Sequence, residues 1–251
     1  MHLRFPLILV AAAFIAPAEF AQEQKTPTVD ELVAKNVEAK GGADALRALQ
    51  SLRLTGKLVV NQGQIEARYL ETKKRPGEIR SEVTLQGMTA IQAYDGKEGW
   101  KVSPFQGRKD PEKMSADEAK SLIEDAEIEG PLIDWKAKGS TVDYLGTEDV
   151  DGTLAYKLKV VRKNGDVNFV YLDPDHFLEI RIVSQRIEHG AQVEVETDLG
   201  DYEKVGGVFI PFSEEAGNKG SPDKQKTVIE KGEANVAVDD AVFRFPTAAG
   251  K

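Results

Sequence analysis

Few residues of this chain could do chemistry, and the densest group is Asp173, Asp175 and His176. Two carboxylates and an imidazole at this spacing could coordinate a metal ion. Asp173-Pro174-Asp175 is, however, first of all a turn sequence, because proline presets the backbone and aspartate caps its own turn. His189 precedes Gly190 and is likewise read as a solvated turn residue. We therefore predict no metal site.

The sequence also lacks the usual nucleophiles. It contains no cysteine, which excludes disulfides, thiolate catalysis, Cys-ligated zinc, iron–sulfur clusters and a lipid-modified cysteine. The Gly-x-Ser-x-Gly motif of serine hydrolases does not occur. The 42 acidic residues could supply a glycosidase pair, but they alternate with apolar residues, as outward-facing strand positions do. We predict no enzyme, no catalytic residue and no cofactor.

A basic run, Lys73-Lys74-Arg75, precedes Pro76-Gly77. Its simplest interpretation is a solvated hairpin tip that discourages edge-to-edge pairing, and the alternative is a docking site for an acidic partner. The whole chain has a formal net charge of -9. A nucleic-acid partner is therefore not expected.

The elements that position these residues are mostly strands, because apolar residues recur at every second position. This alternation is found in five runs: Leu52 to Val60, Ile65 to Tyr69, Tyr156 to Val160, Leu178 to Ile182, and Val193 to Val195. Turn sequences such as Asp95-Gly96, Asp151-Gly152, Asn164-Gly165 and Gly206-Gly207 separate the strands. The pattern predicts about ten or eleven antiparallel strands in meander order. Such a sheet tends to curl, which gives a mainly β fold, a curved and unclosed β-barrel.

The period of two also predicts which side chains face the hollow of this sheet. The concave set is Leu52, Leu54, Leu58, Val60, Leu178, Ile180 and Ile182. The outward set is Arg53, Lys57, Glu179 and Arg181.

Two helices are predicted beside the strands. Thr28 and Glu31 form a capping box that opens an amphipathic helix ending at Gly41-Gly42. A second capping box, Ser115 and Glu118, opens a helix from Ser115 to Ala126. Its apolar stripe is Ala119, Leu122, Ile123 and Ala126. We expect this inserted helix to form a lid over the mouth of the barrel.

The N-terminus reads as an export signal. Arg4 precedes an apolar run from Leu7 to Ala16, which is far shorter than the roughly 20 residues of a spanning helix. We predict cleavage after Ala18, or as late as Ala21. This leaves a single domain over residues 22–246, a tail at 247–251, and a mature protein that is outside the cytoplasm and is not an integral membrane protein.

Six segments stand out by their order and spacing: Gly41-Gly42 to Gly56, Tyr94-Asp95-Gly96 to Trp100, Pro104 to Gly107, Tyr171 to Pro174, Asp201 to Pro211, and Asn235 to Pro246. Together they resemble the periplasmic LolA-like outer-membrane lipoprotein-sorting proteins. The resemblance implies an unclosed antiparallel barrel with helices at its mouth. It also implies a periplasmic location and an apolar interior that shields lipid chains.

A carrier of this kind predicts a lined cavity and a ligand. The candidate lining residues are Leu54, Leu58, Trp100, Phe105, Leu122, Trp135, Ile180 and Ile182. We expect a monomeric, non-enzymatic periplasmic carrier of lipoprotein acyl chains or another lipid, with envelope proteins as donor and acceptor partners. The alternative is an envelope interaction or sensor module whose interior is filled by its own side chains.

Overall fold

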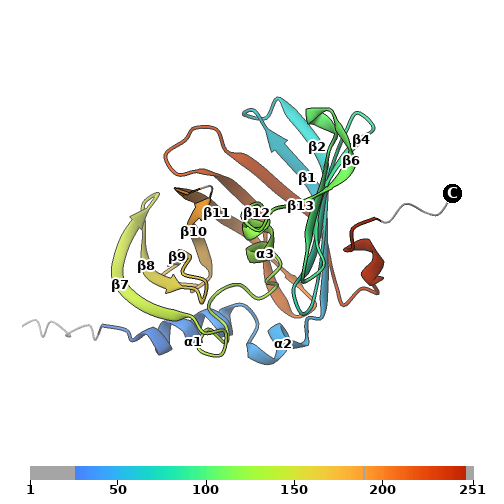
Figure 1. Cartoon of the computed structure of the whole chain (residues 1–251). Coiled ribbons are helices and arrows are strands. Elements are labelled where there is room, and N and C mark those ends of the chain that lie inside the picture. The colour runs from blue at the N-terminus through green and yellow to red at the C-terminus, as the bar shows by residue number, and fades with distance from the viewer. Residues whose placement is uncertain (1–25, 189, 247–251) are drawn as a thin grey trace, which may run out of the picture.

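The computed structural model describes residues 26–188 and 190–246 and contains one curved antiparallel sheet (Figure 1). The sheet has thirteen strands: β1 (Ser51–Val60), β2 (Ile65–Lys74), β3 (Glu78–Leu85), β4 (Met88–Tyr94), β5 (Gly99–Ser103), β6 (Arg108–Lys113), β7 (Thr141–Val150), β8 (Thr153–Val161), β9 (Val167–Leu172), β10 (Glu179–Glu188), β11 (Ala191–Val205), β12 (Val208–Asn218) and β13 (Gln225–Ala234). The helices are α1 (Val29–Ala39), α2 (Ala43–Ala48) and α3 (Lys120–Asp125), with short 3-10 turns η1 (Pro104–Gln106) and η2 (Asp240–Val242).

The strand order confirms an unclosed meander. It runs β6-β5-β4-β3-β2-β1-β13-β12-β11-β10-β9-β8-β7, so β1 pairs with β13 and the two edges are β6 and β7. The chain from 114 to 140, which contains α3, joins these edges and lies within the hollow of the sheet (Figure 1). The predicted count of ten or eleven strands was too low. β6 shows why, because its sequence, RKDPEK, has no apolar residue and hence no alternation.

Two packed cores fill the concave side near α1 and α2. Leu46 and Leu49 of the α2 segment pack with Leu52 and Leu54 of β1. Leu32 and Val33 of α1 pack with the inward residues of β8 and β9, such as Leu158, Val160 and Val170. The predicted capping box of α1 is present, with the Glu31 backbone N–H donating to Thr28 Oγ1 at 3.2 Å.

The predicted register is confirmed for Leu52, Leu54 and Ile182 but is wrong at Glu179 and Ile180. A β-bulge places Glu179 opposite Leu172 and Arg181 opposite Tyr171, which leaves Ile180 as the extra residue. Glu179 therefore turns into the interior, where it is 2% exposed, and Ile180 packs on the convex face. Arg181 stays on the convex face, where its Nη2 lies 2.8 Å from an Asp151 oxygen.

The inserted helix is shorter than predicted, since only Lys120–Asp125 is α-helical. Its capping box is still formed, with the Ser115 backbone N–H donating to Glu118 at 2.9 Å. Ala119, Leu122 and Ala126 are buried, and Leu122 and Ala126 pack with Ile79 of β3. Ile123 departs from the predicted stripe, because 42% of it is exposed.

Candidate functional site

A cavity of about 370 Å³ lies between the α3 segment and the concave face of the sheet. Its floor comes from β2 and from β9 to β13, and its cover comes from α3 and the loop that follows it. One part of the floor, the apolar wall, consists of Ile182, Val195, Leu199 and Ala216. Most of the other lining residues are polar, and eight of the twenty lining residues are charged. The fully apolar interior that the family resemblance implied is therefore not what surrounds this cavity.

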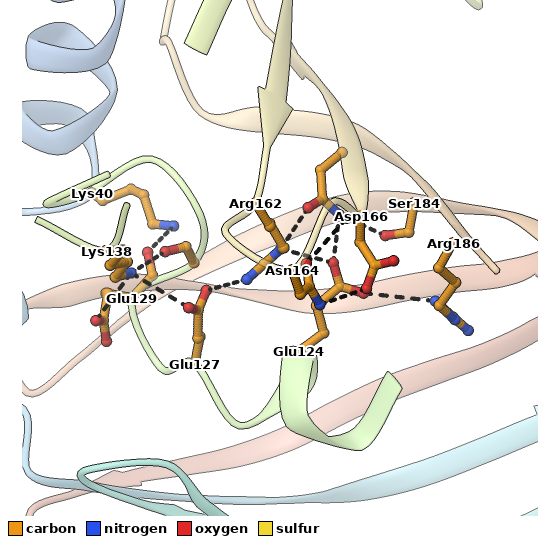
Figure 2. A network of polar contacts seen from close by, with 12 residues as sticks. Lys40, Glu124, Glu127, Glu129, Lys138, Arg162, Asn164, Asp166, Ser184 and Arg186 are labelled. Atoms are coloured by element: carbon orange, nitrogen blue, oxygen red, sulfur yellow. Dashed lines mark hydrogen bonds and ion pairs between the residues drawn. The ribbon is translucent and has the colours of Figure 1, made fainter. Parts of the chain in front are cut away.

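One charged part of the lining, the Arg162 network, consists of Glu124, Glu127, Arg162, Asn168, Ser184 and Arg186 (Figure 2). Arg162 Nε lies 3.0 Å from Glu124 Oε1, and its Nη1 lies 3.1 Å from Glu127 Oε2. Asn168 donates to Glu124 at 2.7 Å and to Ser184 Oγ at 2.8 Å. These contacts tie α3 and the following loop to β9 and β10.

The ion pairs continue beside the cavity toward α1 (Figure 2). Lys138 Nζ lies 3.3 Å from Glu129 Oε1, and Lys40 Nζ donates to the Glu129 carbonyl at 3.2 Å. Lys40 also pairs with the buried Glu179 carboxylate at 3.0 Å. The hydroxyl of Tyr202 donates to the Glu179 carbonyl at 2.8 Å.

The opposite part of the lining, the Lys73 cluster, consists of Tyr69, Glu71, Lys73, Asp125 and Glu214. Lys73 Nζ lies 3.0 Å from Glu71 Oε1, and the Tyr69 hydroxyl donates to Glu71 Oε2 at 2.9 Å. Burial would lower the pKa of Lys73, but the surrounding carboxylates of Glu71, Asp125 and Glu214 outweigh it and raise this pKa. Lys73 is therefore protonated and positively charged near neutral pH.

Two carboxyl groups of this cluster titrate far above their usual range. Burial, followed by repulsion from Glu71 and Asp125, raises the pKa of Glu214 to about 7 against the opposing effect of Lys73. The side chain of Asp125 is exposed because it opens onto the cavity, yet the enclosing protein withdraws it from bulk water and raises its pKa to about 6. Near neutral pH the Lys73 cluster is therefore only partly ionised.

Of the eight predicted lining residues, the structure places Ile182 in the wall of this cavity. Leu54 belongs to the packed core beside α2, and Leu122 belongs to the core between α3 and β3. Leu58 is on the concave face opposite Ala67, Trp135 packs against the α1 core, and Phe105 is 46% exposed in η1. Ile180 is on the convex face because of the bulge. A ligand-binding role for these residues stays a prediction.

Trp100 lies on the convex face, away from the cavity. Trp100 is paired with Ala93 and therefore shares its face of the sheet. The next residue, Tyr94, points to the other face, where it packs beside α3. The indole Nε1 of Trp100 donates to the Phe243 carbonyl at 2.7 Å, and the indole ring packs edge-on against Phe245 at 6.3 Å. The C-terminal segment therefore covers Trp100 on the outer side of the sheet (Figure 1).

Asp173, Asp175 and His176 form the predicted turn. Asp173 Oδ1 accepts from the backbone N–H of Asp175 at 3.0 Å and from that of His176 at 2.7 Å. Within residues 26–188 and 190–246, no group of three or more acidic or histidine residues is arranged to hold a metal ion. His189 and the predicted export signal lie outside the described residues.

The basic run is not the solvated tip that was predicted. Lys73 lines the cavity, Lys74 pairs with Asp240, and Arg75 Nη2 lies 2.8 Å from Glu129. Arg75 also donates to the carbonyls of Leu46 and Leu49. All three cations are thus engaged within the molecule.

Sequence reasoning missed the acidic members of the Lys73 cluster, although a signal existed for two of them. The alternation of Ala67 and Tyr69, continued along β2, places Glu71 and Lys73 on the same inward face. The alternation of Val208, Ile210 and Phe212 similarly leads to Glu214 on β12. No comparable pattern points to Asp125, because its place in the cavity depends on how α3 packs against the sheet.

Comparisons with known proteins identify the fold. No protein-family model matches the sequence, and no curated protein matches it. Three of the crystal structures that match it cover most of the chain and have TM-scores above 0.5. A DUF1329 family protein from Desulfovibrio piger has a TM-score of 0.58 at 14% identity, covering 87% of this chain and 98% of that one. A domain described as an outer membrane lipoprotein-sorting protein, from Vibrio parahaemolyticus, has a TM-score of 0.56 at 12% identity, with coverages of 86% and 95%.

The third match is a LolA superfamily protein from Nitrosomonas europaea, with a TM-score of 0.56 at 11% identity and coverages of 87% and 98%. The fold of this chain is LolA-like. At these identities the likeness concerns the fold alone. The chemistry of the cavity in this LolA-like chain follows from the residues that line it. Among the described residues, none of the helices is long and apolar enough to span a membrane.

Proposed function

We propose that this LolA-like chain is a non-enzymatic carrier that binds a lipid or lipoprotein acyl chain within the periplasm. The observation that carries the proposal is the cavity of about 370 Å³ under the α3 segment, with the apolar wall on its floor. Ligand pockets commonly span roughly 300 to 1,000 Å³, so this cavity suits one short apolar chain. A larger ligand requires the α3 segment to move outward.

The absence of catalysis is part of the proposal. Within the described residues Asp173 is occupied as a turn cap, and His176 contacts that same carboxylate at 3.0 Å on the exposed surface. Neither group faces the cavity. Reproducible turnover that is lost on changing Asp173 or His176 would overturn this part.

A second candidate is an envelope interaction or sensor module. The observation that favours it is the extent to which the protein's own side chains fill the concave side, through the two cores beside α1 and α2 and through the Arg162 network. In that case the cavity holds water and has no ligand.

Native mass spectrometry of the protein purified from its periplasm, followed by lipid extraction, separates the two candidates. A carrier is expected to retain a ligand that Ala216→Phe displaces, because Ala216 lies in the apolar wall. Ala191→Phe is the matched control, since Ala191 is exposed at the start of β11. Ligand retained by both variants would place the binding site elsewhere, and no ligand in any sample would favour the module.

A further inference from the structure

We infer that the cavity selects an amphiphile with a protonated amine head group, whose ammonium binds between Asp125 and Glu214 while its hydrocarbon chain lies on the apolar wall. This inference rests on the proposed function and names the ligand class of the same cavity.

The first support is an unbalanced charge count inside the cavity. Its lining contains five carboxylates, Glu71, Glu124, Asp125, Glu127 and Glu214, and three cations, Lys73, Arg162 and Arg186. In the Arg162 network two carboxylates are matched by two arginines. The excess lies entirely in the Lys73 cluster, where three carboxylates surround one lysine.

The second support is that two of these carboxylates have no partner in the part of the chain that the structure describes. Glu71 is held by Lys73 and Tyr69. Asp125 and Glu214, in contrast, form no hydrogen bond or ion pair with residues 26–188 or 190–246, although both line the cavity. Asp125 is exposed to the cavity and Glu214 is partly exposed there, so each can take up a proton or a cation supplied from outside the chain.

The two carboxylates approach the cavity from different elements, Asp125 from α3 and Glu214 from β12. An ammonium group carries three donors and can therefore bind both at once. Glu214 is paired in register with Leu199, and Ala216 is paired with Thr197. Glu214 thus borders the apolar wall directly, and Asp125 lines the same cavity, which is an arrangement that suits an amphiphile with a cationic head.

Titration supports the same assignment. The groups that face Asp125 and Glu214 are Glu71, Lys73 and Tyr69 from β2, Glu124 from α3, Arg186 from β10 and Tyr202 from β11. Burial raises the pKa of Asp125 to about 6 and that of Glu214 to about 7. Protons therefore compete with an ammonium group, and the competition weakens as pH rises from 5.5 to 8.

The test measures binding of octylammonium, octanol and octanoate by isothermal titration calorimetry at pH 5.5 and pH 8. These probes share one chain and differ in head-group charge. We expect octylammonium to bind more tightly than octanol at pH 8. Its affinity should fall about tenfold at pH 5.5. Octanol should not change between the two pH values.

Glu214→Gln should weaken octylammonium binding at pH 8 by about tenfold, the loss expected for one charge-assisted contact worth about 1.4 kcal/mol. It should leave octanol binding unchanged. Glu215→Gln is the matched control, because Glu215 is the next residue of β12, faces the other side and is paired with Asp198. Circular dichroism verifies that both variants are folded.

The outcomes are distinct. If octanol and octanoate bind as well as octylammonium at pH 8, the inference fails while the proposed carrier function stands. If none of the three probes binds, both fail. If Glu214→Gln does not fold, the pH dependence of octylammonium against octanol in the natural protein still decides the question.

Discussion

Glu214 is a carboxyl group that the fold keeps partly protonated near neutral pH, with burial as the main cause of a pKa of about 7. Between pH 4.5 and 7 the native state binds more protons than the unfolded chain, so stability should fall as pH rises through this range. Glu214→Gln removes the titration. We expect the free energy of unfolding of this variant to exceed that of the natural protein by up to about 3 kcal/mol at pH 8, since a difference of one pKa unit is worth about 1.36 kcal/mol. Near pH 4 the two free energies should be equal.

Urea unfolding at several pH values measures this difference. Glu215→Gln, on the opposite face of the same strand, is the matched control and should not reproduce the gain in stability at pH 8. Equal stability of Glu214→Gln and the natural protein at pH 8 would contradict the prediction.

Glu179 is buried and paired with Lys40, whose side chain is also largely enclosed. Removing one partner of a buried ion pair leaves the other charge uncompensated, which costs about 3–5 kcal/mol. We expect Glu179→Ala to lose stability in this range. Glu179→Ala combined with Lys40→Met should recover most of it, because replacing both charges by apolar groups is often neutral. Chemical unfolding of the two variants tests this, and an equally unstable double variant would show that the ion pair is not the cause.

At the scale of single elements, alternation predicts strands well and fails where the backbone departs from its period. Leu52 and Leu54 lie on the predicted concave face because β1 pairs with β2 without a shift. The prediction fails at Ile180, where a bulge inserts one residue and reverses the faces of Glu179 and Ile180. Nothing in the local sequence marks this bulge, since it depends on distant residues: Lys40 binds the Glu179 side chain and Tyr202 donates to the Glu179 carbonyl.

The α3 helix has only six residues, so its stability comes from packing rather than from helix propensity. Leu122 is 4% exposed and packs with Ile79 and Ala126. We expect Leu122→Asp to release α3 at a cost of a few kcal/mol, since a charge at that position has no partner among apolar side chains. Faster hydrogen exchange over residues 115–138, with protected strands β8 and β9, would show that the segment opens as a lid.

Ile123→Asp is the matched control for this lid prediction, because Ile123 is the adjacent residue and is 42% exposed. It should leave both exchange and ligand binding unchanged. The released lid in Leu122→Asp should alter the binding kinetics of a fluorescent fatty-acid probe. An unchanged probe response in a folded Leu122→Asp variant would contradict the lid and favour the packed module.

At the scale of the whole molecule, the sequence predicts a curved open sheet but not the nature of its hollow. Turn sequences and alternation are local, and they suffice for a meander of antiparallel strands. The cavity depends on contacts far apart in the chain, such as Asp125 approaching Glu214 and Arg162 joining Glu124. For the same reason Trp100 could not be assigned to the convex face, because its cover comes from Phe243 near the other end of the chain.

The sheet is continuous across the pairing of β1 with β13, and the α3 segment contacts strands on both sides of that pairing, β3 through Leu122 and β9 through Glu124. We therefore expect its two halves to unfold together. The two tryptophans report on them separately, because Trp100 belongs to β5 and Trp135 packs against the core beside α1. In Trp135→Phe and Trp100→Phe, the fluorescence of the remaining tryptophan should give the same urea midpoint as circular dichroism of that variant.

Phe243→Ala tests the same coupling from the convex face, because it empties a fully buried position. It should lower both tryptophan midpoints by an amount that corresponds to about 3–5 kcal/mol. Arg244→Ala, at the exposed neighbouring site, should lower neither midpoint. A shift confined to the Trp100 signal would mean that the halves of the sheet unfold independently.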